Sequence, residues 1–205
     1  MSDIPSEYYL PLPVPELPAA AIFDCDGTLV DTMPLHYVAW RETLDGLGHP
    51  HVFPETQFYE WGGTPAQEII ERLNVRHGLS LLPHETATAK EDNYGRLIPD
   101  VKPIGIVVAE ARRLFAAGVP LAVASGGRRD MVEASLAAAG IHDLFPVVVG
   151  SEDVPRGKPE PDVFLRAAEL LGVEATVCVV YEDAPNGLLA GYRAGMRVVD
   201  VTRFL

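Results

Sequence analysis

Four carboxylate side chains follow two short apolar runs of this 205-residue chain, each at the point where the run ends. They are Asp24 and Asp26 after the first run, and Glu182 and Asp183 after the second. Carboxylates that converge on one place repel one another unless a cation neutralises them. Oxygen ligands select a hard cation, and Mg²⁺ is the usual one where phosphate oxygens complete the shell. The pattern therefore predicts a Mg²⁺ site.

A hydroxyl group, a pair of glycines and a lysine follow two further apolar runs. Ser125 precedes Gly126 and Gly127, and Lys158 lies within a Gly-Lys-Pro sequence. Lys158 is one of only three lysines in the chain. A hydroxyl, an ammonium and free backbone N–H groups can together hold a phosphoryl group. Combined with the carboxylates, these residues predict a phosphoryl-transfer site.

Each of these motifs has a simpler interpretation when it is taken alone. Asp-x-Asp-Gly is a common turn composition, and Ser125 could cap a helix. Glu182 and Asp183 could cap the helix predicted from Pro185, and Lys158 could be a surface lysine. All four motifs nevertheless occupy the same kind of place, the end of an apolar run. That shared position favours one composite site over four unrelated features.

Short apolar runs alternate with helix-like stretches, which is typical of an α/β fold whose parallel sheet is covered on both faces. The predicted strands are Ala19–Phe23, Leu121–Ala124, Val147–Val149, Val177–Tyr181 and Val198–Val201. The predicted helices are Ile104–Ala117, Arg129–Ala139, Pro161–Leu171 and Pro185–Ala194. Each of these helices is followed by a glycine, the residue on which helices commonly end. Ligands of such sheets bind beyond the carboxyl ends of the strands, where the motifs above would meet.

One segment departs from this alternation and carries helical patterns without a convincing buried strand. The helical patterns are Leu35–Leu47, Pro65–Leu73 and His84–Leu97. We therefore expect an inserted helical domain over residues 35–102, and a sheet domain built from residues 19–34 and 103–205. Residues 1–18 contain five prolines, which argue against a helix or a central strand. This segment is predicted to be an extended arm that lies on the surface or is disordered.

The formal net charge of −13 comes from 16 Lys and Arg against 29 Asp and Glu. An acidic surface repels nucleic acids and anionic membranes, so neither is expected as a partner, whereas a small phosphorylated metabolite is compatible with a locally positive site. The two cysteines cannot build a disulfide framework, which indicates a reducing compartment. There is no basic leader segment and no apolar run of about 18 residues. We expect a cytoplasmic protein, monomeric or a small homo-oligomer.

The ordered motifs resemble those of the haloacid dehalogenase (HAD) superfamily, and the likeness spans residues 19–201. The matching residues are Asp24-Cys25-Asp26-Gly27-Thr28, Ser125, Gly157-Lys158-Pro159-Glu160-Pro161-Asp162 and Glu182-Asp183. The sequence from Tyr181 to Gly187 is similar to the subgroup of β-phosphoglucomutases and sugar-phosphate phosphatases. The resemblance implies a Rossmann-like parallel sheet core with an α-helical cap inserted after the first motif.

The resemblance also implies which residues do the chemistry. Asp24 would be the nucleophile that forms an aspartyl-phosphate, and Asp26 would be the general acid and then the general base. The Mg²⁺ ligands would be Asp24, Asp183 and the main-chain carbonyl of Asp26. Glu182 would bind the metal directly or stand just behind its ligands.

The same resemblance implies the residues that hold the substrate. Ser125, Gly126 and Lys158 would bind the transferring phosphate, and Lys158 would also neutralise the nucleophile. His36 and Lys90 match positions in the cap of β-phosphoglucomutases that contact the general acid and the sugar.

Two features of the sequence narrow the reaction. The haloalkanoic dehalogenases that gave the superfamily its name lack the second aspartate, so Asp26 favours phosphate chemistry. β-Phosphoglucomutases grip a second phosphate with a cap arginine, and that position falls on Ala66. We therefore predict a phosphatase that acts on a small sugar phosphate such as fructose 1-phosphate. The alternatives are a mutase of the β-phosphoglucomutase type and a phospho-ligand binding domain without catalysis.

Overall fold

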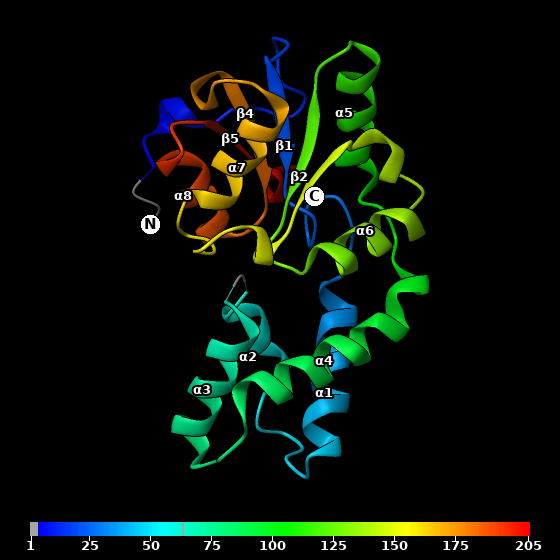
Figure 1. The fold of residues 1–205 in the computed structure, drawn as a ribbon, viewed down its shortest axis with the longest axis vertical. Helices are drawn as coiled ribbons and strands as arrows, with labels where there is room; N and C mark the ends of the chain where they lie inside the picture. The colour runs from blue at the N-terminus through cyan, green and yellow to red at the C-terminus, as the bar shows by residue number, and fades with distance from the viewer. Residues whose placement is uncertain (1–3, 63) are drawn as a thin grey trace. The chain divides into compact units, whose positions relative to one another are not determined.

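The computed structural model describes residues 4–62 and 64–205, and the chain divides into two compact units (Figure 1). One unit combines the N-terminal segment up to Asp31 with Lys102–Leu205, and it contains the sheet. The other unit is Thr32–Val101, and it is helical. We call them the sheet unit and the helical unit.

Five parallel strands form one sheet in the order β3-β2-β1-β4-β5. They are β1 (Ala20–Phe23), β2 (Leu121–Ala124), β3 (Val147–Val149), β4 (Cys178–Glu182) and β5 (Arg197–Asp200). Residues of β1, β2 and β4 are buried throughout, because helices cover both faces of the sheet. The α/β class with a parallel sheet is confirmed, and each strand begins and ends within one residue of its predicted bounds.

The described part of the sheet unit contains four α-helices. They are α5 (Gly105–Ala116), α6 (Arg129–Ala138), α7 (Asp162–Leu171) and α8 (Pro185–Arg193). Ile22 and Val180 belong to the apolar cluster that α7 and α8 share with the sheet. On the other face, the neighbouring Tyr181 reaches α5. The glycines predicted to follow these helices all have positive φ angles, between 67° and 79°. Short 3₁₀ turns occupy Ser6–Tyr8, His142–Leu144, Ser151–Asp153, Ala175–Val177 and Val201–Phe204.

The proline-rich arm is bound more closely than its composition predicts. Ile4, Leu12 and Val14 are buried, and the N–H of Leu10 donates to the carbonyl of Val198 on β5 at 2.8 Å. Apart from the 3₁₀ turn, no helix or strand forms in the described part of the arm, as expected. The alternative prediction, that this segment is disordered, is wrong for residues 4–18, because three of its apolar side chains are buried. Residues 1–3 lie outside the described chain.

The helical unit has its own apolar core. Its helices are α1 (Met33–Gly46), α2 (Glu55–Glu60), α3 (Ala66–His77) and α4 (Pro83–Leu97), followed by the 3₁₀ turn Ile98–Asp100. The core side chains are Trp40, Leu44, Phe53, Phe58, Ile69, Ile70 and Leu73. Trp40 is thus a core residue, and Trp61 packs against the same cluster. Helix α2 was not predicted, since its six residues are too few for a helical period to stand out.

The two chain segments that border the helical unit pair with each other inside the sheet unit. Asp31 N–H donates to the carbonyl of Lys102, and Ile104 N–H donates to the carbonyl of Leu29, both at 2.8 Å. Val30 and Pro103 form an antiparallel bridge between these two hydrogen bonds. The insertion therefore leaves and re-enters the sheet unit at neighbouring residues.

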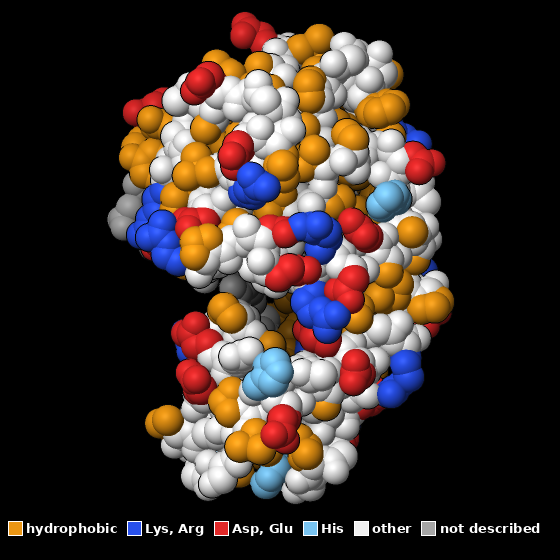
Figure 2. Space-filling view, in the orientation of Figure 1, with side chains coloured by type: hydrophobic (Ala, Val, Ile, Leu, Met, Phe, Trp, Pro, Cys, Tyr) orange, Lys and Arg blue, Asp and Glu red, His pale blue; other side chains and the backbone are white. Residues whose placement is uncertain are grey.

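Charged side chains of both signs are interspersed over the face of the molecule shown in Figure 2, rather than gathered into one basic surface. Within residues 4–62 and 64–205, no helix combines the length and apolarity that a membrane crossing requires.

Candidate functional site

The first motif forms a tight loop at the carboxyl end of β1. Asp24 N–H donates to the carbonyl of Tyr181 on β4 at 2.9 Å, which ties the start of the loop to the neighbouring strand. The carbonyl of Cys25 then accepts hydrogen bonds from the N–H groups of the next turn, those of Thr28, Leu29 and Val30. This turn leaves the buried Asp24 side chain at the edge of the sheet.

Gly27 is required by its conformation and by its neighbour. Its φ of +87° is one that side-chain-bearing residues rarely adopt, and a Cβ built on it would collide with the carboxylate of Asp183. Thr28 completes this contact, because its hydroxyl donates to Asp183 Oδ1 at 3.0 Å. The sequence prediction gave Thr28 no role, although its fixed place after Asp-x-Asp-Gly was a signal. The first motif thus leaves room for the Asp183 carboxylate at Gly27 and binds it through the Thr28 hydroxyl.

Three of the predicted carboxylates come together at this edge. Asp24, Glu182 and Asp183 each offer an oxygen within 4.8 Å of the other two. Their geometry follows from the pairing of β1 with β4, which aligns Phe23 with Tyr181 and so places the residues after each strand side by side. The structure thus gathers a cluster of oxygen donors of the kind that binds a cation.

Lys158 also reaches this cluster, as its sequence position predicted. Its ammonium donates to Asp24 Oδ1 at 2.5 Å and to Glu182 Oε1 at 2.8 Å, and it lies 5.0 Å from the ring of Phe164. The second oxygen of Glu182 accepts the N–H of Ala184 at 2.6 Å. Both oxygens of Glu182 are therefore engaged by the protein, and this carboxylate positions Lys158.

The electrostatics of the cluster favour a bound cation. Burial, followed by the nearby Glu182 and Asp183 charges, raises the pKa of Asp24 well above its usual range, although Lys158 acts in the opposite direction. Burial and Glu182 raise the pKa of Asp183 to about 7, against the hydrogen bond from Thr28. Three ionised carboxylates and one ammonium carry a net charge of −3 + 1 = −2. A divalent cation cancels this charge, so the donor set fits one.

The second motif forms a turn beside the first. The buried Ser125 donates its N–H to the carbonyl of Val149 at 3.0 Å, and its hydroxyl accepts the N–H of Gly127 at 3.0 Å. Asp26 faces this turn, since its Oδ2 lies 3.6 Å from the position that a Cβ on Gly127 would occupy. Its carboxyl group therefore lies near the Ser125 turn.

Two arginines after this turn are already paired. The guanidinium of Arg128 forms an ion pair with Asp130, and that of Arg129 does so with Asp153. The N–H of Arg129 also donates to Glu152 Oε1 at 3.0 Å. These contacts favour the interpretation of both side chains as part of a solvated surface.

In the helical unit, the two residues singled out from the sequence lie together. Lys90 Nζ is 2.8 Å from His36 Nδ1 and 2.9 Å from Glu91 Oε1, and Lys90 is buried. The imidazole of His36 stacks on Tyr94 with ring centres 3.9 Å apart. Ala66, at the position where mutases carry an arginine, begins α3 and packs against the apolar core of the unit.

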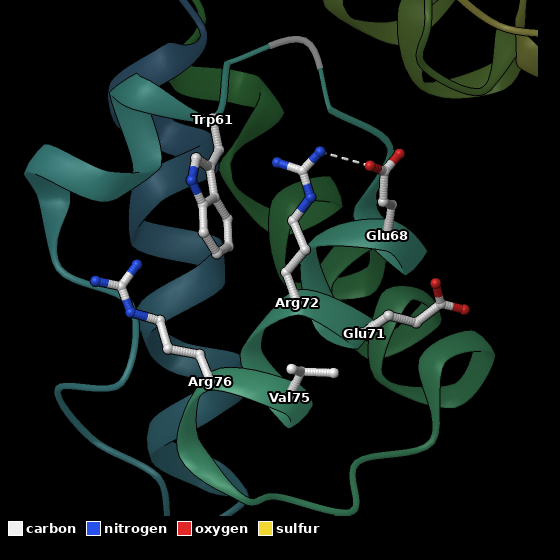
Figure 3. A pocket seen from close by; sticks show the side chains of 6 residues that line it. All are labelled: Trp61, Glu68, Glu71, Arg72, Val75 and Arg76. Carbon is white, nitrogen blue, oxygen red and sulfur yellow. Dashed lines mark hydrogen bonds and ion pairs between the residues drawn. The ribbon is translucent and has the colours of Figure 1, made fainter.

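Sequence reasoning did not predict a groove on the helical unit, about 360 Å³ in volume (Figure 3). It is lined by Trp61, Glu68, Glu71, Arg72, Val75 and Arg76. Arg72 lies 5.3 Å from the Trp61 ring and forms an ion pair with Glu68 at 2.5 Å. No pattern in the sequence distinguishes these residues from an ordinary helix surface.

Comparisons with known proteins show which family and relatives this chain is similar to. A family model described as haloacid dehalogenase-like hydrolase matches residues 18–195. The fructose-1-phosphate phosphatase YqaB of Escherichia coli K12 is 37% identical over 185 residues, which cover 89% of this chain and 96% of that protein. Validoxylamine A 7′-phosphate phosphatase of Streptomyces hygroscopicus is 34% identical over 188 residues, covering 89% of this chain and 84% of that protein.

Solved structures show the same likeness. The crystal structure of CbbY from Rhodobacter sphaeroides in complex with phosphate superposes with a TM-score of 0.80 at 30% identity, covering 89% of this chain and 85% of that one. A β-phosphoglucomutase from Clostridium difficile has a TM-score of 0.76 at 24% identity over 88% of this chain and 82% of that one, and it shows the shared fold alone.

Proposed function

Because the chain belongs to the haloacid dehalogenase-like hydrolase family, we propose that it is a Mg²⁺-dependent phosphatase of a small sugar phosphate such as fructose 1-phosphate. The observation that carries the proposal is the contact between Lys158 and Asp24 beside Asp183. It combines a nucleophile, a cation for phosphate oxygens and a cation-binding carboxylate in one place. The phosphatase activities in the names of two relatives support this choice.

The donor set described above suits Mg²⁺. Asp24, Asp183 and the main-chain carbonyl of Asp26 would hold the ion, with Glu182 behind them. When bound, the ion neutralises the carboxylates and the phosphate, so that the two anions can approach. Glu182 keeps its contacts with Lys158 and the N–H of Ala184, and so fixes the lysine that faces the nucleophile.

Asp24 and Asp26 divide the chemistry between them. A carboxylate oxygen of Asp24 attacks phosphorus while the bond from phosphorus to the sugar oxygen breaks, and Asp26 gives its proton to that oxygen. In the second half, Asp26 takes a proton from a water molecule whose oxygen attacks phosphorus. The bond from phosphorus to Asp24 then breaks, which releases inorganic phosphate and restores both side chains. The position of Asp26 near the Ser125 turn supports its role beside the transferring group.

The remaining residues hold the phosphate and the sugar. The hydroxyl of Ser125, the N–H of Gly126 and the ammonium of Lys158 would contact phosphate oxygens. We assign residues 19–34 and 103–205 to the catalytic core and residues 35–102 to a cap that binds the sugar through His36 and Lys90. The partner of this protein would then be a small phosphorylated metabolite.

A phosphate-release assay over a panel of sugar phosphates tests the proposal. Fructose 1-phosphate, hexitol phosphates and pentulose phosphates are each incubated with the protein in Mg²⁺ or in EDTA. We expect release from one or a few of them in Mg²⁺ and loss of release in EDTA. Release that persists in EDTA, or no release from any sugar phosphate, would contradict the proposal.

Product analysis separates the phosphatase from a mutase. Lys90 and His36 match mutase residues, but Ala66 offers no guanidinium for a second phosphate. Incubation with β-glucose 1-phosphate and a trace of the bisphosphate should therefore give free phosphate rather than glucose 6-phosphate. Glucose 6-phosphate formed without phosphate release would reverse this assignment.

A further inference from the structure

The N-terminal arm contacts Glu110 of α5, which is hydrogen-bonded to Tyr181 in the strand that ends at the carboxylate cluster. The family match begins at residue 18, so the arm precedes the part of the chain shared with that family. Val14 of the arm is buried, and its N–H donates to Glu110 Oε1 of α5 at 3.0 Å. Its carbonyl accepts a hydrogen bond from Arg113 at 3.2 Å, so both polar backbone groups of Val14 are held by α5.

Glu110 connects this contact to the sheet. It is only 4% exposed, and the same Oε1 that binds Val14 also accepts the hydroxyl of Tyr181 at 3.1 Å. Arg113 donates to Oε1 at 2.9 Å and to Oε2 at 2.7 Å, which compensates the buried charge. Burial acts to raise the pKa of Glu110, but the hydrogen bonds from Arg113 and Val14 outweigh it and leave the pKa below its usual value. One carboxylate thus joins the arm, α5 and β4.

Tyr181 lies next to the carboxylate cluster and contacts the ends of both β1 and β4. It precedes Glu182 and Asp183, and its carbonyl accepts the N–H of Asp24 at 2.9 Å. Its ring stacks on Phe23, the residue before Asp24, at 4.3 Å and 13°. The side chain of Tyr181 therefore contacts the ends of both strands that carry the carboxylates, β1 through Phe23 and β4 through its own position before Glu182.

The rest of the arm is fixed well enough to hold Val14 in place. Its dark blue segment in Figure 1 runs beside β5 and α8, where Tyr9 bridges to Val198. Tyr8 meets Tyr192 of α8 edge to face, with ring centres 4.7 Å apart. Ile4 joins the apolar cluster beneath α7 and α8. These contacts spread the attachment of the arm over two faces of the sheet unit.

We propose that Glu110 is a positioning residue for the cation-binding carboxylates, and that the arm helps to hold Glu110 in place by donating the Val14 N–H to its carboxylate. The inference rests on the proposed function, because it assigns the arm an effect on that same site. Residues that orient metal ligands from behind change metal affinity by about tenfold or more when they are altered. We expect a loss of cation affinity of the same size when a hydrogen bond to Glu110 is removed.

Two variants remove one hydrogen bond each from Glu110. Val14→Pro deletes the N–H donor in a segment already flanked by prolines, and Tyr181→Phe deletes the hydroxyl. Val14→Ala is the matched control, because it loses the same buried side chain and keeps the N–H. Leu136→Ala, in the buried face of α6, controls for a general loss of stability.

Binding of Mn²⁺ to the full-length protein without substrate, followed by electron paramagnetic resonance, is the direct readout, with phosphate release as the second. We expect Val14→Pro and Tyr181→Phe each to weaken Mn²⁺ binding by about tenfold and to lower kcat with KM for the sugar phosphate nearly unchanged. The double variant should bind Mn²⁺ only slightly less tightly than the single variant with the lower affinity, because both changes act through one carboxylate. Val14→Ala and Leu136→Ala should bind Mn²⁺ as the wild type does.

Each outcome decides the proposal. If the two variants lose thermal stability but keep wild-type Mn²⁺ affinity, as Leu136→Ala should, the arm is only structural and the proposal is wrong. If Val14→Ala weakens Mn²⁺ binding as much as Val14→Pro, the N–H is not the determinant and the proposal also fails. If the wild-type protein itself neither binds Mn²⁺ nor releases phosphate, the proposed function is overturned together with this inference.

Discussion

The ammonium of Lys158 lies 2.5 Å from a carboxylate oxygen of Asp24, across 134 positions of sequence. Both side chains are more than nine-tenths buried, and Asp24 together with Glu182 raises the pKa of Lys158 despite its burial. The raised pKa keeps the lysine charged at neutral pH. In the ion-free protein it is a counter-ion of the cluster, and in the proposed reaction it would also contact phosphate oxygens.

Removing this ammonium should destabilise the ion-free protein. Lys158→Ala leaves the buried Asp24 and Glu182 carboxylates without their cation, which we expect to cost about 3–5 kcal/mol of unfolding free energy. Chemical denaturation in EDTA measures the loss, and added Mg²⁺ should recover part of it. Lys102→Ala, at an exposed lysine, is the control and should change little. An equal effect of both substitutions would contradict a buried ion pair.

Asp24→Asn tests the nucleophile. The amide keeps the size of the side chain but cannot attack phosphorus, so we expect phosphate release to fall by about 10³-fold or more. Initial rates with the preferred sugar phosphate measure the change. Asp31→Asn, at an exposed aspartate shortly after the motif, should retain wild-type rates. Turnover by Asp24→Asn near the wild-type rate would rule out the aspartyl-phosphate.

Gly27→Ala tests the contact between the first motif and Asp183. The left-handed backbone alone costs about 1–2 kcal/mol with a side chain, and the new methyl group must also displace the Asp183 carboxylate. We expect a lower melting temperature and a loss of cation affinity. Gly105→Ala is the matched substitution, because its Cβ meets nothing within 4 Å and its φ is not positive. The contact would be unimportant if both variants bound Mg²⁺ equally well.

The raised pKa of Asp183 predicts how pH changes the ion-free protein. Its folded value of about 7 exceeds the usual value of 3.8, so the folded state holds a proton that the unfolded state releases. Stability from this group is therefore complete below about pH 3.8 and is lost as the pH rises to about 7. Thermal unfolding in EDTA between pH 5 and pH 8 should show this fall.

Mg²⁺ binding should show the opposite dependence on pH. The ion competes with the proton on Asp183, so its affinity is expected to rise with pH and to level off above about pH 7. Calorimetry in buffers of different ionisation enthalpy should then detect proton release on binding at pH 6. Affinity independent of pH between 5 and 7 would show that Asp183 is already ionised without the ion.

Lys90→Met tests the role assigned to the helical unit. If Lys90 contacts the sugar, the change should lower kcat/KM for the preferred sugar phosphate by at least about tenfold. It should affect p-nitrophenyl phosphate, which lacks the sugar, much less. Arg96→Met is the control: Arg96 is on α4 like Lys90, its exposed ion pair is with Glu42 of α1, and its loss should leave activity on both substrates unaffected. Equal losses on both substrates for Lys90→Met would indicate a structural role for the Lys90–His36 pair.

The strands and the residues at their ends could be predicted from the sequence, because a local apolar run marks each strand and the parallel topology brings the strand ends together. The apolar runs predicted β1 and β4, and the rule that ligands bind beyond strand ends predicted that Asp24 and Asp183 lie together, as they do in the structure. Lys158 was predicted for the same reason, although it lies in a loop rather than directly after a strand.

Other features depend on contacts that no local pattern encodes. The arm was predicted only as extended, because a proline-rich composition reveals nothing of a backbone N–H that meets Glu110 across 96 positions. Thr28 was overlooked since its hydroxyl partner, Asp183, lies 155 positions away. The pairing of His36 with Lys90 likewise joins two helices and is visible only in three dimensions.

The paired borders of the helical unit have a consequence for how such enzymes diversify. Because Asp31 and Lys102 are hydrogen-bonded neighbours, we expect that the segment between them can be exchanged as one cassette without altering the strand order of the sheet. A chimera that carries the segment 32–101 from a relative of different substrate preference would keep the same reaction and inherit a new specificity. If residues 35–102 bind the sugar, as proposed, this architecture would let substrate choice change while the reaction stays the same.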